Sequence, residues 1–579
     1  MTEPYVVAFD TETRGLDWSN PDERAFLGTW ADCDGAYHAD LSIPGDAFEF
    51  VNALERADVL VAHNASFDVH HVREATGYDI LKSNAQLQDT DLMSRIILPE
   101  GQRRGERGGH GLKHLAVTYL DPRAGEGEDA IVEAAKKIGV KLKSPGGYYD
   151  VWRAYPATME HYARLDSRYT YDLFMNFQSR FDENTRRCYD LELAVQPLLI
   201  QLEQRGVALD PEAVDRLRRH YHTRANELRD SLLGEGFPEG ALDGTGSEAA
   251  LLEHLQMLGV PLWKKTQTGK ISTDKYALEE FVDDFPQLRD LQEFRQANRF
   301  LSTYIGPMMG RPVVHTSFMQ CEAWTGRMSS RKPNMQNIPK AAGKEVRSMF
   351  VPRPGFLLVV ADYEAIEVRL LAHYLGTTGA PYRALINEGL DPHAWMASRI
   401  WGGDPLEYGK GAPKEAQRDQ GKTTLFSITY GAGKPLISKR LGISKTEAGH
   451  LIGSVKDAIP GFHTLQRRLR KKVERDGFVS TLFGRKQPVA KDKAYVAMNA
   501  LIQGSAADIM KAGFVKATAE LEFVGGHPLL LVHDELVAEV PAPAADLGAA
   551  AVVRGMTNAY PLDPALSVTT SIVPNYSEA

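Results

Sequence analysis

Residues 418–431 read RDQGKTTLFSITYG, and this stretch decides how the rest of the chain is interpreted. Four of its residues recur at every fourth position: Arg418, Lys422, Phe426 and Tyr430. Because residues four apart stay on one face of an α-helix, that face presents two cations and then two aromatic rings. A nucleoside triphosphate offers phosphates, then a sugar and a base. We therefore predict a helix that binds one, with Lys422 able to protonate the departing pyrophosphate.

Two apolar runs elsewhere in the chain each end in a carboxylate. FLLVVA ends at Asp362, and PLLLV ends at His533-Asp534-Glu535. Mg²⁺ prefers oxygen ligands and keeps several waters, so one or two carboxylates with substrate phosphates hold it. We predict that Asp362 and Asp534 meet in space and bind two Mg²⁺ ions for nucleotidyl transfer.

Each of these residues also has an ordinary explanation. An aspartate after a strand is more often a helix N-cap, and cations four apart are commonly a solvated helix face. Aromatic residues on a helix are by default core residues. Only the occurrence of all three elements in one chain favours a nucleotide site.

Together the three elements resemble the core motifs of family A DNA polymerases, the class that includes bacterial DNA polymerase I. The resemblance implies a right-hand fold of palm, fingers and thumb that extends primer-template DNA with dNTPs, using Mg²⁺ that Mn²⁺ can replace. It places Glu535 beside the metals and His533 near the primer terminus. It also places Tyr363 and Glu367 at the dNTP, with Glu367 as a steric gate against a ribose 2′-hydroxyl. Phenylalanine at 426, where a tyrosine hydroxyl could replace the missing 3′-oxygen, implies rejection of dideoxynucleotides.

Two further segments match the parts of the family that contact DNA. They are TGRMSSRKPNMQNIP at 325–339 and NALIQGSAADIMK at 499–511. Arginine and amide side chains can reach minor-groove acceptors that all base pairs share. The alternative for any single asparagine is a loop amide that satisfies the backbone. The residues expected to contact DNA are Arg327, Asn334, Gln336, Asn337, Asn499, Gln503 and His533.

The first third of the chain carries a second acidic set. Asp10 and Glu12 alternate on the strand-like run YVVAFDTET and so share a face. HNASFD supplies Asp68, and Tyr162 precedes Asp166 by one helical turn. This set resembles the DEDD-type 3′–5′ exonucleases, an RNase H-like fold in which two metal ions and a tyrosine-oriented water cleave a phosphodiester. The segments around Asn64 and at 112–116 match as well. The expected metal ligands are Asp10, Glu12, Asp68 and Asp166, with Tyr162 as the catalytic tyrosine, and we predict an active proofreading site.

The fold class predicted is a multidomain α/β chain. The expected order is a 3′–5′ exonuclease domain at 1–185, a thumb at 186–312, palm at 313–375, fingers at 376–495 and palm again at 496–579. With no 5′-nuclease domain ahead of residue 1, this layout resembles a bacteriophage replicative polymerase. We therefore expect a monomer in the cytoplasm, that of the host if phage-encoded, with possible helicase or single-strand binding protein partners.

Composition agrees with an intracellular, membrane-free protein. The 579 residues include three scattered cysteines, at 33, 188 and 321, which form no disulfide framework. A net charge of −9 taken alone argues against nucleic-acid binding, so local clusters matter more. Residues 467–472 are interpreted as a solvated helix face. The expected DNA track is Arg327, Arg331, Lys332, Lys340, Lys344 and Arg347.

Three departures from the family pattern bear on fidelity and template grip rather than on the metal ligands. Glu364-Ala365 replaces a common Ser-Gln, Tyr495 replaces an arginine, and Leu501-Ile502 replaces Pro-Met. Two other functions stay open: a single-subunit RNA polymerase, which Glu367 disfavours, and a catalytically silent DNA-binding factor, which the intact carboxylates disfavour.

Overall fold

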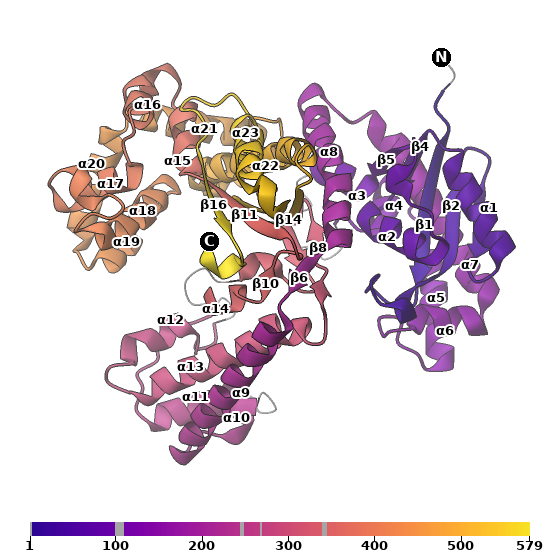
Figure 1. Cartoon of the computed structure of the whole chain (residues 1–579), viewed down its shortest axis with the longest axis horizontal. Helices are drawn as coiled ribbons and strands as arrows, with labels where there is room; N and C mark the ends of the chain where they lie inside the picture. Colours follow the sequence, from indigo (N-terminus) through magenta and orange to yellow (C-terminus); the bar gives the residue numbers. More distant parts are fainter. Residues whose placement is uncertain (1–2, 99–108, 244–247, 267–268, 339–343) are drawn as a thin grey trace. The chain divides into compact units, whose positions relative to one another are not determined.

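The computed structural model describes residues 3–98, 109–243, 248–266, 269–338 and 344–579 (Figure 1). The chain forms two compact units. The larger comprises Met1–Arg205, Phe318–Ser329 and Val359–Ser571, and the smaller comprises Gly206–Ser317, Ser330–Leu358 and Ile572–Ala579. Within the described ranges, no helix combines the length and the apolar character needed to cross a membrane. Lys340 of the expected DNA track lies outside these ranges.

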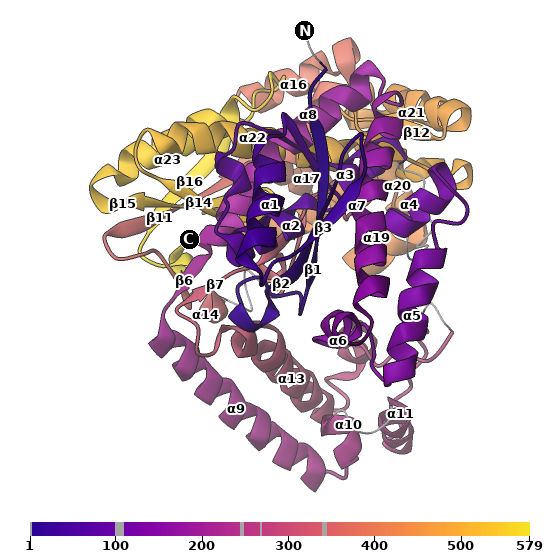
Figure 2. The same cartoon turned by 90° about the vertical axis from the view of Figure 1, so that its right-hand side faces the viewer.

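The N-terminal part of the larger unit is a five-stranded sheet with helices on both faces (Figure 2). The strand order is β3-β2-β1-β4-β5, with β1 parallel to β4 and antiparallel to β2. The strands are β1 (Val6–Thr13), β2 (Ala25–Ala31), β3 (Ala36–Asp40), β4 (Val59–Ala62) and β5 (Gln86–Asp89). The helices are α1 (Pro44–Glu55), α2 (Ala65–Thr76), α3 (Thr90–Ile97), α4 (Leu112–Tyr119), α5 (Glu126–Ile138), α6 (Gly147–Ala154) and α7 (Pro156–Gln178).

The two-residue period of β1 divides its side chains between these faces. Val7 and Phe9 pack in a core with α1 and α2, whereas Ala8 packs in a separate core with α3 and α7. Asp10 and Glu12 follow Ala8 at even spacing, so they face the side that α7 covers. The predicted strand (β1) and the predicted helix (α7) are therefore confirmed. The two-residue alternation along β1 places both carboxylates on one face of the sheet.

The remainder of the larger unit surrounds a four-stranded sheet of order β14-β15-β11-β16. The predicted hairpin is confirmed as β14 and β15, whose apolar residues Leu529, Leu531 and Val537 are buried. The strands are β11 (Phe356–Tyr363), β12 (Phe478–Ser480), β13 (Lys486–Pro488), β14 (His527–Val532), β15 (Glu535–Pro541) and β16 (Val568–Val573). The helices are α8 (Glu183–Arg205), α15 (Ile366–Tyr374), α16 (Ala380–Asn387), α17 (Pro392–Trp401), α18 (Glu415–Thr429), α19 (Lys434–Leu441), α20 (Lys445–Ala458), α21 (Phe462–Asp476), α22 (Ala497–Glu522) and α23 (Ala545–Thr557).

The smaller unit is a helical hairpin on a three-stranded sheet of order β10-β6-β7. Its longest helix, α9, begins at Pro211, and the Asp210 side chain caps it by accepting from the amides of Glu212 and Ala213. Leu232 of α9 and Leu291 of α13 share one apolar core. The strands are β6 (Val207–Leu209), β7 (Val313–Val314) and β10 (Phe350–Val351), while β8 (Ser317–Met319) and β9 (Ser329–Arg331) lie where the chain passes between units. The helices are α9 (Pro211–Gly234), α10 (Glu239–Asp243), α11 (Glu248–Met257), α12 (Lys275–Leu278), α13 (Gln287–Arg299) and α14 (Lys344–Arg347).

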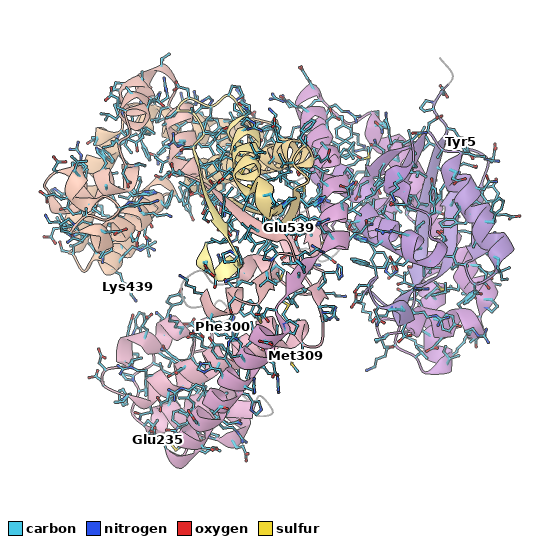
Figure 3. The ribbon with its side chains drawn as sticks, viewed as in Figure 1. Tyr5, Glu235, Phe300, Met309, Lys439 and Glu539 are labelled. Carbon is cyan, nitrogen blue, oxygen red and sulfur yellow. The ribbon has the colours of Figure 1, made fainter. Side chains whose placement is uncertain are left out.

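These units differ from the predicted boundaries, most extensively at two places. The expected thumb began at 186, but α8 belongs to the larger unit; residues 330–358, expected in the palm, belong to the smaller one. One cause is an ion pair at the end of α8. Glu539 (labelled in Figure 3) is fully buried on β15, and Arg205 of α8 lies 2.6 Å from its carboxylate.

A buried network of charges holds the middle of α8. Glu192 accepts hydrogen bonds from Arg485 and from Lys511 of α22. The Arg485 Nε donates to Asp508 at 2.8 Å, and the Lys511 Nζ donates to the Gly326 carbonyl at 2.9 Å. The four charges balance, and all are buried. Buried ion pairs tolerate the low dielectric only while every partner stays in place.

Replacing Lys511 with methionine is expected to destabilise the larger unit by about 3–5 kcal/mol, because it leaves a buried charge uncompensated. The measurement is the denaturant midpoint of the variant, followed by tryptophan fluorescence. Lys516→Met is the matched control, since Lys516 lies on the same helix and is exposed. Equal denaturant midpoints for the Lys511 and Lys516 variants would show that this network does not stabilise the larger unit.

Candidate active sites

The two predicted palm carboxylates come from adjacent elements. β15 lies beside β11 in the sheet, and the Tyr363 amide donates to the Asp534 carbonyl at 3.2 Å. Asp362 and Asp534 are both partly exposed, whereas Glu535 is buried. The β11 end and the hairpin turn, 172 positions apart, are therefore joined through the backbone. Partly exposed carboxylate oxygens at such a junction are a donor set that fits Mg²⁺.

The predicted nucleotide-binding helix is α18. Arg418, Lys422 and Phe426 lie on it, and Tyr430 is its C-cap residue. The rings of Phe426 and Tyr430 are stacked, with centroids 6.0 Å apart and planes inclined by 14°. Lys422 is exposed. The helix thus ends in a pair of parallel rings, one turn beyond its cations.

Glu367, the predicted steric gate, lies in the first turn of α15 and faces these rings. Its carboxylate accepts from the Tyr430 hydroxyl and, at 3.1 Å, from the guanidinium of Arg327. Burial, reinforced by this neighbouring carboxylate, raises the pKa of Tyr430 above its usual range. Gln503 of α22 is a further hydrogen-bond partner of that hydroxyl. Three predicted residues therefore meet around Tyr430.

Sequence reasoning missed the partner of Arg418. Asp391 caps α17, accepting from the His393 amide at 2.9 Å, and it also accepts from the Arg418 Nε at 2.6 Å. Although burial opposes its charged form, these hydrogen bonds hold the pKa of Asp391 below its usual value. His393 packs its ring 5.6 Å from that of Phe426, and burial lowers its pKa to about 4. The Asp-Pro-His order is a helix-start signal, which alone does not indicate a contact with Arg418.

Tyr363 differs from its predicted role. Its side chain is buried, and its hydroxyl donates to the Met556 carbonyl at 2.8 Å. The ring is therefore part of the core beside α23, and only the backbone of this residue lies at the carboxylate junction. Burial raises the pKa of its phenol.

The predicted DNA-contact residues fall into different environments. Asn499 and Gln503 are partly exposed on α22, while His533 is exposed with a left-handed φ of 59°. In the smaller unit, Gln336 is buried, and the Asn334 side chain accepts from the Gln336 amide at 3.1 Å. The Asn334 oxygen thus bonds within its own loop, and Asn337 is exposed, so their contacts with DNA stay predictions.

One cation of the expected DNA track was assigned wrongly. Arg347 is buried, and its guanidinium lies 4.3 Å from the ring centroid of Tyr576. It belongs to the core of the smaller unit because aromatic contact offsets the loss of its hydration. Arg331, Lys332 and Lys344 are exposed.

Two of the three departures from the family pattern have local explanations. Glu364 accepts from the Ser567 hydroxyl at 2.7 Å, so its charge is held toward the chain before β16. Leu501 and Ile502 are buried core residues, whereas Tyr495 is 57% exposed. Gly431 has a φ of 85°, and a Cβ there would lie 3.0 Å from the Tyr495 carbonyl. The structure gives no account of Tyr495 in place of arginine.

The second acidic set meets between β1 and α7. Ligand oxygens of Asp10, Glu12 and Asp166 all lie within 4.8 Å of one another. Asp68 approaches from α2, on the other side of the sheet, and accepts from the Thr11 amide at 2.9 Å and from the Thr11 hydroxyl at 2.7 Å. Three carboxylates therefore form a cluster. The fourth, that of Asp68, is held by Thr11, the residue between Asp10 and Glu12 on β1.

Crowding and burial disfavour the charged forms of these acids. Burial raises the pKa of Asp10 to about 7, and burial with the Asp10 charge raises those of Glu12 and Asp68 well above their usual values. Divalent cations would relieve this repulsion, so the donor set fits two of them. Burial also raises the pKa of Tyr162 and keeps it a neutral phenol.

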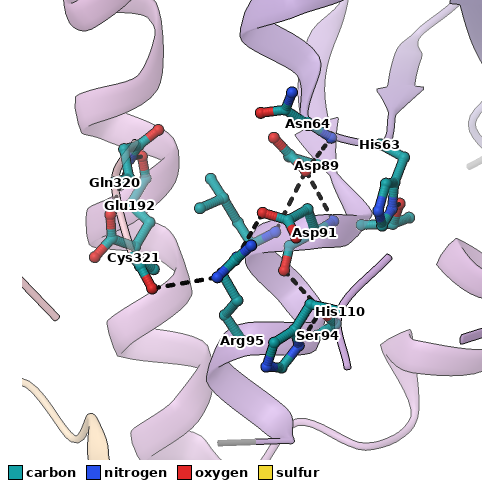
Figure 4. Close-up of polar contacts among 12 residues, drawn as sticks. His63, Asn64, Asp89, Asp91, Ser94, Arg95, His110, Glu192, Gln320 and Cys321 are labelled. Carbon is teal, nitrogen blue, oxygen red and sulfur yellow. Dashed lines mark hydrogen bonds and ion pairs between the residues drawn. The ribbon is translucent and has the colours of Figure 1, made fainter. Parts of the chain in front are cut away.

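The loop that leads to Asp68 is organised by a residue that the sequence did not indicate. Asp89 accepts from the amides of Asn64 at 3.0 Å and Asp91 at 2.8 Å (Figure 4). It also accepts from Gln196 of α8 at 2.7 Å. Asn64 has a φ of 68°, which non-glycine residues rarely adopt. Asp89 thus holds a strained loop at the start of α2, and Arg95 on α3 extends the network to the Cys321 carbonyl.

Known protein families match both the N-terminal and the C-terminal part of the chain. A model of DNA polymerase family A matches residues 241–578, and a model of the 3′–5′ exonuclease family matches residues 2–182. DNA polymerase I of Chloroflexus aurantiacus is 33% identical over 89% of this chain and 54% of that protein. DNA polymerase I of Pseudomonas aeruginosa is 29% identical over 100% of this chain and 64% of that protein.

Among solved structures, the chain resembles the POL domain of Pol1 from M. smegmatis in complex with DNA primer-template and dNTP. The TM-score is 0.78 at 25% identity, and the likeness covers 100% of this chain and 96% of that one. The chain spans about half to two thirds of the length of the curated relatives named above. By the extent of the family match, this chain belongs to DNA polymerase family A.

Proposed function

We propose that this protein is a template-directed DNA polymerase that adds dNTPs to a primer 3′ end and proofreads with a 3′–5′ exonuclease. The observation that carries the proposal is the hydrogen bond from Tyr363 to the Asp534 carbonyl, since it joins the two carboxylate-bearing strand ends. Family membership and the DNA and dNTP bound by the M. smegmatis relative support it.

In the proposed polymerase reaction, Asp362 and Asp534 would hold two Mg²⁺ ions, and bound ions would supply Lewis-acid chemistry at the primer hydroxyl and the leaving pyrophosphate. Arg418 and Lys422 neutralise the triphosphate, and Lys422 donates a proton to the pyrophosphate. The stacked rings of Phe426 and Tyr430 provide the apolar surface for sugar and base.

In the proposed exonuclease reaction, the four carboxylates Asp10, Glu12, Asp68 and Asp166 would hold two Mg²⁺ ions, and bound ions would supply the Lewis-acid chemistry that makes water nucleophilic. Tyr162 stays protonated because burial raises its pKa, so its hydroxyl can orient that water. Mn²⁺ substitution, a phage origin and cytoplasmic location stay predictions, as do helicase and single-strand binding partners.

One primer-extension gel in Mg²⁺ tests the proposal. With dNTPs the labelled primer should lengthen, and without them it should shorten. Extension with NTPs in preference to dNTPs would favour a single-subunit RNA polymerase. A primer unchanged in both lanes would favour a silent DNA-binding factor.

Replacing Glu367 with alanine is expected to admit ribonucleotides, because it removes the side chain that lies against Tyr430. The ratio of kcat/KM for dCTP over CTP should fall at least about tenfold, or about 1.4 kcal/mol. Glu367→Gln is the matched control, since it keeps the size of the side chain and a hydrogen bond to Tyr430. An unchanged preference for dCTP over CTP in the alanine variant would show that Glu367 is not a steric gate.

Replacing Asp391 with asparagine is expected to raise the KM for dNTPs about tenfold with a smaller effect on kcat. Asparagine still caps α17, but the charge-assisted bond that orients Arg418 is lost. Steady-state kinetics on a primed template measure both constants. Asp404→Asn is the control, because Asp404 is an exposed cap that no arginine among the described residues contacts. A KM equal to that of the control would show that Arg418 needs no such support.

A further inference from the structure

Lys113 lies inside the carboxylate cluster of the proposed exonuclease site. It is the second residue of α4, and its Nζ forms an ion pair with the Asp166 Oδ1. The same Nζ lies 4.3 Å from the ring centroid of Tyr162. Burial lowers the pKa of Lys113 to about 8, whereas its further acidic neighbours Asp10, Glu12 and Glu128 favour its charged form. One cation therefore faces three expected metal ligands and the expected catalytic tyrosine.

A structural salt bridge is the ordinary explanation for a lysine beside a buried aspartate. Two observations argue that Lys113 has a role beyond that of a structural ion pair. The lysine side chain is only 18% exposed, so its charge is withdrawn from water where three carboxylates already meet. Asp166 is itself an expected ligand, and its oxygen cannot bind a divalent ion while it is fully engaged with an ammonium group.

The balance of charges in the site indicates that this lysine stabilises negative charge during the reaction. The four carboxylates carry four negative charges, which two divalent ions neutralise. A phosphodiester then adds one uncompensated negative charge, and hydrolysis adds more in the transition state. In a water-excluded site a preplaced cation stabilises such charge most effectively. Lys113 supplies the one positive charge that this balance lacks.

We propose that Lys113 is a catalytic residue of the exonuclease site, which pairs with Asp166 in the metal-free protein and contacts the scissile phosphate when substrate is bound. This rests on the proposed exonuclease function. Two consequences follow from the geometry. Lys113 competes with divalent ions for Asp166, so removing it tightens metal binding; it also stabilises the transition state, so removing it slows hydrolysis.

The experiment combines both consequences in Lys113→Met, a variant of similar size without charge. Isothermal titration with Mn²⁺ in the absence of DNA should show tighter binding than wild type. Single-turnover degradation of a labelled oligonucleotide at saturating Mn²⁺ should slow about a hundredfold. Lys137→Met is the matched control, since Lys137 pairs with Glu133 on the exposed face of α5. An Asp10→Ala, Glu12→Ala double variant identifies the heat that comes from this site.

Primer extension by Lys113→Met serves as the folding check and should equal that of wild type. Weaker or unchanged Mn²⁺ binding together with slow hydrolysis would overturn the proposal and leave Lys113 a structural residue. Unchanged hydrolysis would overturn it as well. If the wild type itself degrades no DNA, the proposed exonuclease function fails, while the Mn²⁺ titration still decides whether Lys113 competes for Asp166.

Discussion

Replacing Asp534 with alanine will abolish primer extension while the same protein continues to degrade the primer. The hydrogen bond that joins the hairpin turn to β11 uses the Asp534 carbonyl, so alanine keeps this backbone contact and removes only the carboxylate. Losing one of two metal-binding side chains is expected to cost about 4 kcal/mol of transition-state stabilisation or more, which is about a thousandfold in rate. Asp362→Ala is expected to behave alike, because Asp362 is the other proposed ligand.

The measurement is extension of a labelled primer with dNTPs, beside degradation of that primer without them. Asp546→Ala is the matched control, since Asp546 is exposed at the start of α23, close in sequence to the hairpin. The control should extend primers at the wild-type rate. Near-normal extension by either ligand variant would show that the palm carboxylates do not hold the metals.

The opposite separation of activities is expected from the double variant Asp10→Ala, Glu12→Ala. Their oxygens lie within 4.8 Å of each other and of Asp166, so the variant removes two of the three clustered ligands. Degradation of a mismatched primer should fall by about a thousandfold or more, because the remaining carboxylates cannot position two metal ions. Extension of a matched primer should continue, since the palm residues are untouched.

Glu49→Ala combined with Glu55→Ala is the matched control, because both glutamates are exposed on α1 of the same domain. It should degrade DNA at the wild-type rate. Persistent degradation by the Asp10, Glu12 variant would place the nuclease site elsewhere. Loss of both activities would indicate instead that these carboxylates are needed for folding.

The sequence by itself determined the features that depend on local periodicity. A four-residue spacing was enough to place Arg418, Lys422 and Phe426 on one helix face, and a two-residue spacing was enough to place Asp10 beside Glu12. The hairpin that carries Asp534 also followed from its own apolar runs. These patterns are local because backbone hydrogen bonding fixes which neighbours share a face.

Only the tertiary structure decided which charges are paired and which are buried. Asp391 reaches Arg418 across 27 positions, and Lys113 reaches Asp166 across 53. Arg347 read as an exposed cation but is buried against Tyr576. Periodicity contains no information about such partners, because ion pairing in a low-dielectric interior depends on the folding of distant segments onto one another.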